Sequence, residues 1–279
     1  MQPLQSAYAF DCVFVYPAGD RPIGRSLALA GEFARAEVEF LGEQLPEDGV
    51  MYDVGANLGT VSIPIARHRP KAQLFAFEAQ PGIHHLLRRN IGLNGLVNVQ
   101  TFHGALGESD GVIDFPAPPL TSVGNFGGIG RDAKVQHMGK VTMRRLDSLD
   151  LPPPNLVKID VEGFDLEVVQ GGLELVRKHR PVLFYEALRA AKTVELNRLL
   201  HEEGYRLFWF FAPYITPMNL RGMKLKNALR GDMNVAAFPP GIDPVWPLPQ
   251  LRRPDEKAAE RAGEYGYLKR FGYEDQPKK

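Results

Sequence analysis

The sequence predicts an α/β fold in which helices cover both faces of a mostly parallel sheet. Short apolar runs that suit strands alternate along the chain with segments of helical spacing, which is typical of a parallel sheet. The run from Val50 to Gly59 has the pattern of a strand, a glycine turn and the start of a helix. Two late strand-like runs are joined by an irregular connection, which indicates an antiparallel close of the sheet.

The N-terminal part, residues 1–46, is expected to be a β-rich lead-in followed by a helix. Residues 8–30 contain the apolar run Val13–Tyr16, a turn and the run Ile23–Leu27, which we interpret as irregular β structure. Residues 32–45 then place apolar side chains at helical spacing. The central sheet is therefore expected to begin after residue 46.

The main domain is expected to span residues 47–240. Its seven predicted strands occupy 50–53, 72–77, 96–102, 156–160, 182–185, 205–211 and 233–238. Helical segments separate several of them, as at 81–94, which begins with a proline. Short apolar runs and many glycines predict a β-rich insertion at about 111–145, with a flexible loop from Thr121 to Gly130. Residues 241–279 are rich in proline, so we expect them to leave the domain as a C-terminal tail.

Composition limits the classes of protein to which the chain can belong. Lys plus Arg and Asp plus Glu number 33 each, so no overall field attracts nucleic acid or an anionic membrane. Cys12 is the only cysteine, which excludes an intramolecular disulfide. The first ten residues lack the pattern of a signal peptide, and no apolar run approaches the length of a membrane span. These features lead us to expect a cytoplasmic protein.

The segment from Asp53 to Gly59 carries the first functional signal. Gly55 and Gly59 allow a tight turn before a helix whose free N–H groups can meet a ligand. Glu78 ends the next apolar run, 25 residues after Asp53, where a carboxylate can accept hydrogen bonds from two ribose hydroxyls. Asp53 would repel a pyrophosphate but suits a cationic ligand, such as the amino group and sulfonium of S-adenosylmethionine. The alternative is an ordinary strand-to-helix turn with an exposed glutamate.

Four stretches together resemble the FkbM family of S-adenosylmethionine-dependent methyltransferases. They are Ile23–Leu27, Asp53–Gly59, Phe75–Glu78 with the helix that follows it, and Lys158–Gly163. The resemblance covers roughly residues 10–240. It implies a class I methyltransferase fold, which is a Rossmann-like sheet of seven strands with an antiparallel last strand. It also implies methyl transfer to an oxygen, often a hydroxyl of a sugar or a polyketide.

The resemblance and the glycine turn together predict the S-adenosylmethionine site. Its expected residues are Asp53, Gly55, Ala56, Asn57, Gly59, Glu78, Ala79, Gly104, Ala105 and Asp160. These residues follow or end the first four predicted strands of the main domain. They are therefore expected to meet at the carboxyl edge of the sheet, where ligands bind in such folds.

Three carboxylates are the candidate catalytic groups, because transfer to a hydroxyl needs a base or a metal near the methyl group. Asp160 and Glu162 follow the fourth strand, and both can reach the cleft if the chain turns at Gly163. Glu186 ends the fifth strand. A divalent metal such as Mg²⁺, held by Asp160 and Glu162, is left open. The alternatives are that Glu162 caps the next helix and that Glu186 pairs with a basic side chain.

Asn125 and Asn234 are the candidate substrate-binding residues, because amides suit the hydroxyls of a sugar. The predicted activity is O-methylation of a hydroxyl on a sugar, a glycan or a related natural product, with a small-molecule or glycan acceptor and no nucleic acid. Two alternatives stay open. An RNA methyltransferase on the same fold is disfavoured by the neutral charge, and a non-catalytic nucleoside-binding protein is disfavoured by Asp160 and Glu162.

Overall fold

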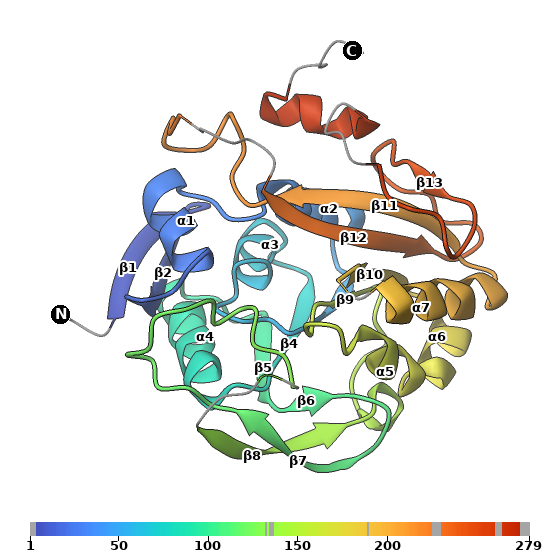
Figure 1. The fold of residues 1–279 in the computed structure, drawn as a ribbon, viewed down its shortest axis with the longest axis horizontal. Helices are drawn as coiled ribbons and strands as arrows, with labels where there is room; N and C mark the ends of the chain where they lie inside the picture. The colour runs from blue at the N-terminus through green and yellow to red at the C-terminus, as the bar shows by residue number, and fades with distance from the viewer. Residues whose placement is uncertain are drawn as a thin grey trace.

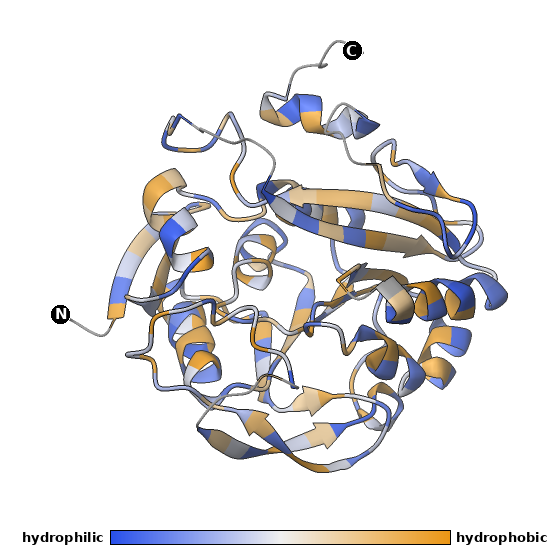
Figure 2. Ribbon diagram, in the orientation of Figure 1, coloured by the Kyte–Doolittle hydropathy of each residue, from blue (hydrophilic) through white to orange (hydrophobic). Residues whose placement is uncertain are grey.

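The computed structural model describes residues 4–131, 133, 137–188, 190–224, 230–259 and 264–273. Its centre is a sheet of eight strands in the order β13-β11-β12-β10-β9-β3-β4-β5 (Figure 1). The strands are β3 (Val50–Val54), β4 (Gln73–Glu78), β5 (Val99–His103), β9 (Leu156–Ile159), β10 (Val182–Glu186), β11 (Arg206–Pro213), β12 (Gly231–Phe238) and β13 (Gln250–Leu251). Hydrophobic residues are concentrated in the strands of this sheet and on one side of the helices that flank it (Figure 2).

The directions of the strands confirm the predicted fold class. Strands β3, β4, β5, β9 and β10 run parallel, and β12 enters antiparallel between β10 and β11. This is the class I methyltransferase topology with its reversed last strand. The two-residue strand β13 adds an eighth strand to the seven predicted, because Gln250 and Leu251 pair with β11. A strand this short has no recognisable pattern in a proline-rich segment.

Helices cover both faces because the strand order reverses beside β3. The chain proceeds from β3 to β4 and β5 on one side, whereas β9 and β10 lie on the other. Right-handed crossovers therefore place α3 and α4 on one face and α5 to α7 on the opposite face. The helices are α1 (Ile23–Ala30), α2 (Arg35–Gln44), α3 (Ser62–His68), α4 (Pro81–Leu93), α5 (Asp165–Gln170), α6 (Leu173–His179) and α7 (Ala190–Glu202). The carboxyl edge at this reversal is where ligands bind in open α/β sheets.

The N-terminal lead-in is a hairpin of β1 (Leu4–Ala9) and β2 (Cys12–Pro17), followed by a helix. The expectation of β structure for Ile23–Leu27 was wrong, because these residues begin α1. Ile23 and Leu27 are both buried at a spacing of four residues, which is helical. The hairpin is fixed to α4, since Asn90 Oδ1 accepts a hydrogen bond from Val15 N at 2.7 Å. It thereby holds the start of α1 near the carboxyl edge of the sheet.

A second, three-stranded sheet lies below the carboxyl edge in Figure 1. Its order is β6 (Ala105–Leu106), β8 (Met138–Arg144) and β7 (Gly111–Pro116). Strands β7 and β8 fall within the predicted insertion at 111–145, and they pair antiparallel. β6 connects this sheet to the main one because it directly follows β5.

The described part of the C-terminal segment 241–279 packs onto the main sheet rather than leaving it as a tail. Trp246, Tyr267 and Phe271 are 3% exposed or less and belong to the main core. The rings of Tyr267 and Phe210 stack with centroids 4.8 Å apart, and those of Trp246 and Phe40 are 5.3 Å apart. The burial of these aromatic side chains therefore holds the segment against the main sheet, although the segment is rich in proline.

Substitution of Trp246 tests this packing. Trp246→Ala should lower the free energy of unfolding by about 3–5 kcal/mol, the range for deleting a fully buried aromatic side chain. Urea unfolding followed by circular dichroism measures the change. The neighbouring Val245→Ala is the control, because Val245 is 47% exposed and should have little effect. Equal stability of Trp246→Ala and the parent protein would contradict the packing of this segment.

Candidate functional site

The turn after β3 has a backbone that only glycine can occupy at one position. Gly55 has a φ of +81°, and a Cβ there would lie 1.9 Å from the carbonyl oxygen of Asp160. The N–H groups of Gly55 and Ala56 both donate to the carbonyl oxygen of Phe77 at 2.9 Å. The turn is thus tied to β4 on one side and packed against the end of β9 on the other.

Glu78 lies at the end of β4 and faces this turn. Its carboxylate accepts hydrogen bonds from the N–H groups of Asn57, at 2.9 Å, and Gln80, at 2.7 Å. Burial raises the pKa of Glu78 to about 7, against the opposing effect of these two hydrogen bonds. A glutamate held by two backbone donors has a fixed orientation, which suits it to recognise a pair of hydroxyl groups.

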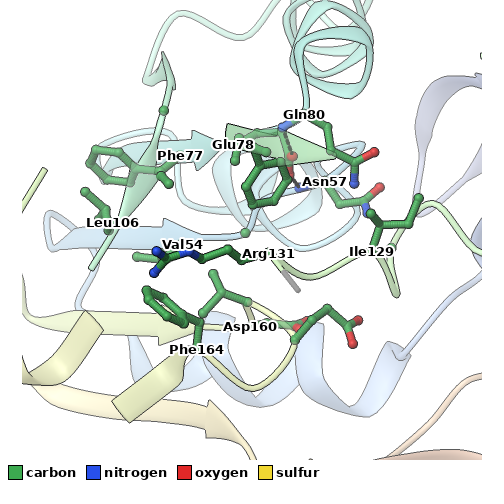
Figure 3. A pocket seen from close by; sticks show the side chains of 18 of the residues that line it. Val54, Asn57, Phe77, Glu78, Gln80, Leu106, Ile129, Arg131, Asp160 and Phe164 are labelled. Carbon is green, nitrogen blue, oxygen red and sulfur yellow. Dashed lines mark hydrogen bonds between the residues drawn. The ribbon is translucent and has the colours of Figure 1, made fainter. Parts of the chain in front are cut away.

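A pocket, here called the first cavity, opens beside Glu78 (Figure 3). The predicted cofactor residues that line it are Gly55, Asn57, Glu78, Ala79, Gly104, Ala105 and Asp160. Three other predicted cofactor residues do not line it. Ala56 lines a different cavity, Gly59 packs against Ile63, and Asp53 is fully buried.

The sequence did not identify the residues that the insertion contributes to this cavity. Ile113 and Phe115 of β7 line it, as do Ile129 and Arg131 of the loop before β8. The guanidinium of Arg131 lies 4.9 Å from the centre of the Phe164 ring, and both point into the cavity in Figure 3. The alternation of Ile113 and Phe115 along a strand was the available signal, because residues two apart share a face.

Asp53 forms part of a buried ionic network beneath the turn. Lys158 Nζ lies 3.5 Å from Asp53 Oδ1 and 3.2 Å from Asp160 Oδ2, and the Ser62 hydroxyl also donates to Asp53. Burial by itself would lower the pKa of Lys158, but Asp160 and Asp53 together raise it above its usual value. Lys158 is therefore a fixed cation that links β3 to the acidic end of β9.

A second pocket, here called the second cavity, lies on the other side of the turn. Five residues line both cavities, namely Gly55, Asn57, Gly127, Asp160 and Glu162. Glu186 and Asn125 line the second cavity but not the first. Asn234 lines neither of the two cavities. Asn234 is 4% exposed and pairs in register with Glu186 across β10 and β12. The two cavities thus meet at the residues that follow β3 and β9.

The three predicted catalytic carboxylates come together at this junction. One ligand oxygen each from Asp160, Glu162 and Glu186 lies within 4.8 Å of the others. Glu162 and Gly163 have φ values of +57° and +83°, so the chain turns sharply after β9 and brings Asp160 and Glu162 to one cluster. Burial and the neighbouring Asp160 raise the pKa of Glu162 to about 8 and that of Glu186 to about 10.

The two alternatives for Glu162 and Glu186 can be compared with the contacts of the described residues. The residue that caps α5 is Phe164, and Glu162 makes no capping bond. Among the described residues Glu186 has no ion-pair partner, and its Oε2 makes no hydrogen bond. Both side chains line the second cavity.

The opposite wall of the second cavity was not predicted. Glu37 of α2 is 6% exposed, and burial raises its pKa to about 8. The hydroxyl of Tyr214 donates to Asp232 Oδ1 at 2.7 Å, and the Tyr214 ring stacks on Phe33 with centroids 5.2 Å apart. Nothing in the sequence distinguishes Glu37 from the other acids of its helix. Asp232 could have been noticed, because it lies two residues before the predicted site residue Asn234 on the same strand. This wall offers both acidic groups and an aromatic face.

Within the described ranges of the chain, no helix has the length and apolar character needed to cross a membrane.

Comparison with known proteins places these features in a family. The profile of the methyltransferase FkbM domain matches residues 53–207. The hexuronic acid methyltransferase AglP of Haloferax volcanii is 33% identical over 140 residues, which are 48% of this chain and 54% of that protein. The 2-O-methyltransferase NoeI of Sinorhizobium fredii is 32% identical over 152 residues, covering 48% of this chain and 61% of that protein. The matched stretch therefore spans between half and two thirds of the length of these relatives.

A solved FkbM methyltransferase from Methylobacillus flagellatus is 16% identical, with a TM-score of 0.46 over 69% of this chain and 44% of that chain. At this distance the superposition carries no argument about function. The profile match is different, because it covers more than half of the chain and includes the turn, Glu78 and the acidic ends of β9 and β10. On that ground the chain belongs to the FkbM methyltransferase domain family.

Proposed function

We propose that this protein is an S-adenosylmethionine-dependent O-methyltransferase that acts on a hydroxyl of a sugar, a glycan or a related natural product. The observation that carries the proposal is the junction of two cavities. The first cavity has Glu78 and the glycine turn, and the second is lined by carboxylates. Asp160 and Glu162 line both, so a methyl group presented from one cavity would meet an acceptor in the other.

The cofactor is proposed to occupy the first cavity with its ribose hydroxyls on Glu78. Ala79, Gly104 and Ala105 would then border the adenine, since they follow β4 and β5. The sulfonium would point to the shared residues Gly55 and Asp160. Asp53 would act on the cofactor only through Lys158, because it has no exposed surface.

The acceptor is proposed to enter the second cavity beside the loop that contains Asn125. Its hydroxyl oxygen would attack the methyl carbon of the bound cofactor, the carbon–sulfur bond would break, and S-adenosylhomocysteine would leave. The proton of the hydroxyl passes to a carboxylate, for which Asp160 is the candidate because it lies at the junction. Phe33 and Tyr214 offer an aromatic face of the kind that packs against a sugar ring.

The names of the relatives support this class of acceptor. AglP is named for hexuronic acid and NoeI for a 2-O position. The neutral charge of the chain argues against an RNA acceptor, and the acidic second cavity argues against a protein that only binds nucleosides. We further propose a cytoplasmic location, where the single cysteine would stay reduced.

Incubation with S-adenosylmethionine labelled in its methyl group tests the proposal. Hexuronic acids, neutral glycosides and transfer RNA serve as acceptors. Label on a sugar oxygen supports the proposal, whereas label only on RNA supports the first alternative. Cofactor binding without transfer to a broad set of hydroxyl acceptors would favour the non-catalytic alternative.

Glu78 provides a test of the cofactor position. Glu78→Gln keeps the shape of the side chain and removes its charge, so it should weaken cofactor binding by about 1–3 kcal/mol. The parent protein should also lose affinity as the pH falls through about 7, where Glu78 gains a proton, and the variant should not. Calorimetry across this pH range measures both effects. Glu47→Gln is the control, because the Glu47 side chain is 54% exposed; unchanged affinity in Glu78→Gln would remove Glu78 from the site.

Asp160 provides a test of the transfer step. Asp160→Asn should lower kcat by about 10²-fold or more, because it removes the group that accepts the proton. Cofactor affinity should change much less, since Glu78 and the turn remain. Single-turnover rates at saturating cofactor separate the two quantities. A rate equal to that of the parent protein would reject Asp160 as the base.

A further inference from the structure

The charge of the second cavity is unbalanced. Five carboxylates line it, from Glu37, Asp160, Glu162, Glu186 and Asp232. Lys158 is the only Lys or Arg among the described residues of that lining, and it is already held between Asp53 and Asp160. Buried carboxylates without a counter-charge are unfavourable unless they take up protons or bind a cation.

Three of these carboxylates have the arrangement of a cation site. The ligand oxygens of Asp160, Glu162 and Glu186 lie within 4.8 Å of one another. An octahedral ion with oxygens at about 2.1 Å places adjacent oxygens about 3.0 Å apart and opposite oxygens about 4.2 Å apart. Three oxygens already this close can therefore bind one ion after small side-chain movements.

Glu37 gives an independent indication from another element. It comes from α2, is 6% exposed and lines the same cavity. Among the described residues its carboxylate has no hydrogen-bond or ion-pair partner, although such a partner is the rule for a group so deeply buried. Burial raises the pKa of Glu37 most, the nearby Lys158 lowers it and Asp160 raises it. A buried acid that faces this cavity without a hydrogen-bond partner supports a cationic ligand in the same space.

We propose that Asp160, Glu162 and Glu186 bind one divalent cation of the Mg²⁺ class. The donors are all carboxylate oxygens, which hard cations prefer, and the cluster contains no His or Cys that would favour zinc. Glu186 is thereby a ligand rather than a second base, and Asp160 would bind the ion through one carboxylate oxygen and keep the other as the candidate proton acceptor.

The role of this ion rests on the proposed function. Its remaining positions face the second cavity, where acceptor oxygens can replace water. A bound cation lowers the pKa of a hydroxyl that it contacts. Two neighbouring acceptor oxygens would bind better than one, so the site favours sugars with adjacent hydroxyls or with a carboxylate beside a hydroxyl. The ion would also allow an anionic acceptor to bind, because its positive charge offsets the repulsion from the five carboxylates.

Mn²⁺ binding to the full chain tests the site without any turnover. Mn²⁺ prefers the same oxygen ligands, and its free form is measured by electron paramagnetic resonance. We expect one ion per chain, displaced by Mg²⁺. Glu186→Gln and Glu162→Gln should each weaken Mn²⁺ binding about tenfold or more, because each removes a charged ligand.

Asp232→Asn is the matched control. It removes one negative charge from the same cavity, but Asp232 is bound by Tyr214 and is not part of the cluster. It should weaken Mn²⁺ binding less than about threefold, the effect of a charge that is not a ligand. Equal weakening by Asp232→Asn and Glu186→Gln would indicate diffuse attraction and overturn the site.

Two further results separate this inference from the proposed function. Absence of stoichiometric Mn²⁺ in a folded protein that binds S-adenosylmethionine would overturn the cation site and leave the methyltransferase proposal standing. In that case the cluster would be assigned to an amine of the acceptor, and amino sugars should bind with an affinity that Glu186→Gln reduces. Stoichiometric Mn²⁺ in a protein that binds no S-adenosylmethionine would overturn the proposed function and support the site.

Discussion

The buried ion pairs of Lys158 are the constraint on which the rest of the site depends. Lys158 is 3% exposed, and it lies directly opposite Asp53 in the pairing of β9 with β3. Its ammonium contacts carboxylates at the ends of both strands, so removing it would leave the fully buried Asp53 without a counter-charge, whereas the Asp160 side chain is 42% exposed to solvent. The backbone of the turn after β3 packs against the end of β9 at the same place. The carbonyl of Asp160 there leaves no space for a side chain at Gly55. Lys158 therefore fixes the position at which the two cavities meet.

The sequence predicted the parts of the site that depend on local pattern. A glycine turn between a strand and a helix, and an acid at the end of the next strand, are local features, and both were found where expected. Asp53 shows where such reasoning ends. Successive side chains of a strand point to opposite faces, so Val54 lines the first cavity while Asp53 turns toward Ser62 of α3. The position of Asp53 beside the glycine turn did not reveal that its side chain points away from the first cavity.

The parts that escaped prediction depend on contacts between distant segments. Ile113 and Arg131 reach the first cavity because the insertion folds back over the carboxyl edge of the sheet. Trp246 packs beside Phe40, more than 200 residues earlier in the chain. Glu37 acquires its significance only because α2 faces the second cavity. In each case the residue type is ordinary for its local segment, and its role comes from the neighbour that the tertiary fold supplies.

The distribution of charge at the junction has a consequence for the proposed methyl transfer. A sulfonium loses its positive charge as the methyl group leaves, so carboxylates around it stabilise the starting state more than the transition state. An acid-lined cavity therefore opposes the reaction unless its charge is offset. Lys158 offsets part of it, and the divalent cation proposed for Asp160, Glu162 and Glu186 would offset more. A carboxylate that accepts the proton of the acceptor hydroxyl favours the reaction instead. It loses its negative charge as the sulfur loses its positive charge, so the net charge around the sulfur stays the same. Under the proposed function, the acid that accepts this proton must lie where the two cavities meet, and Asp160 lines both of them.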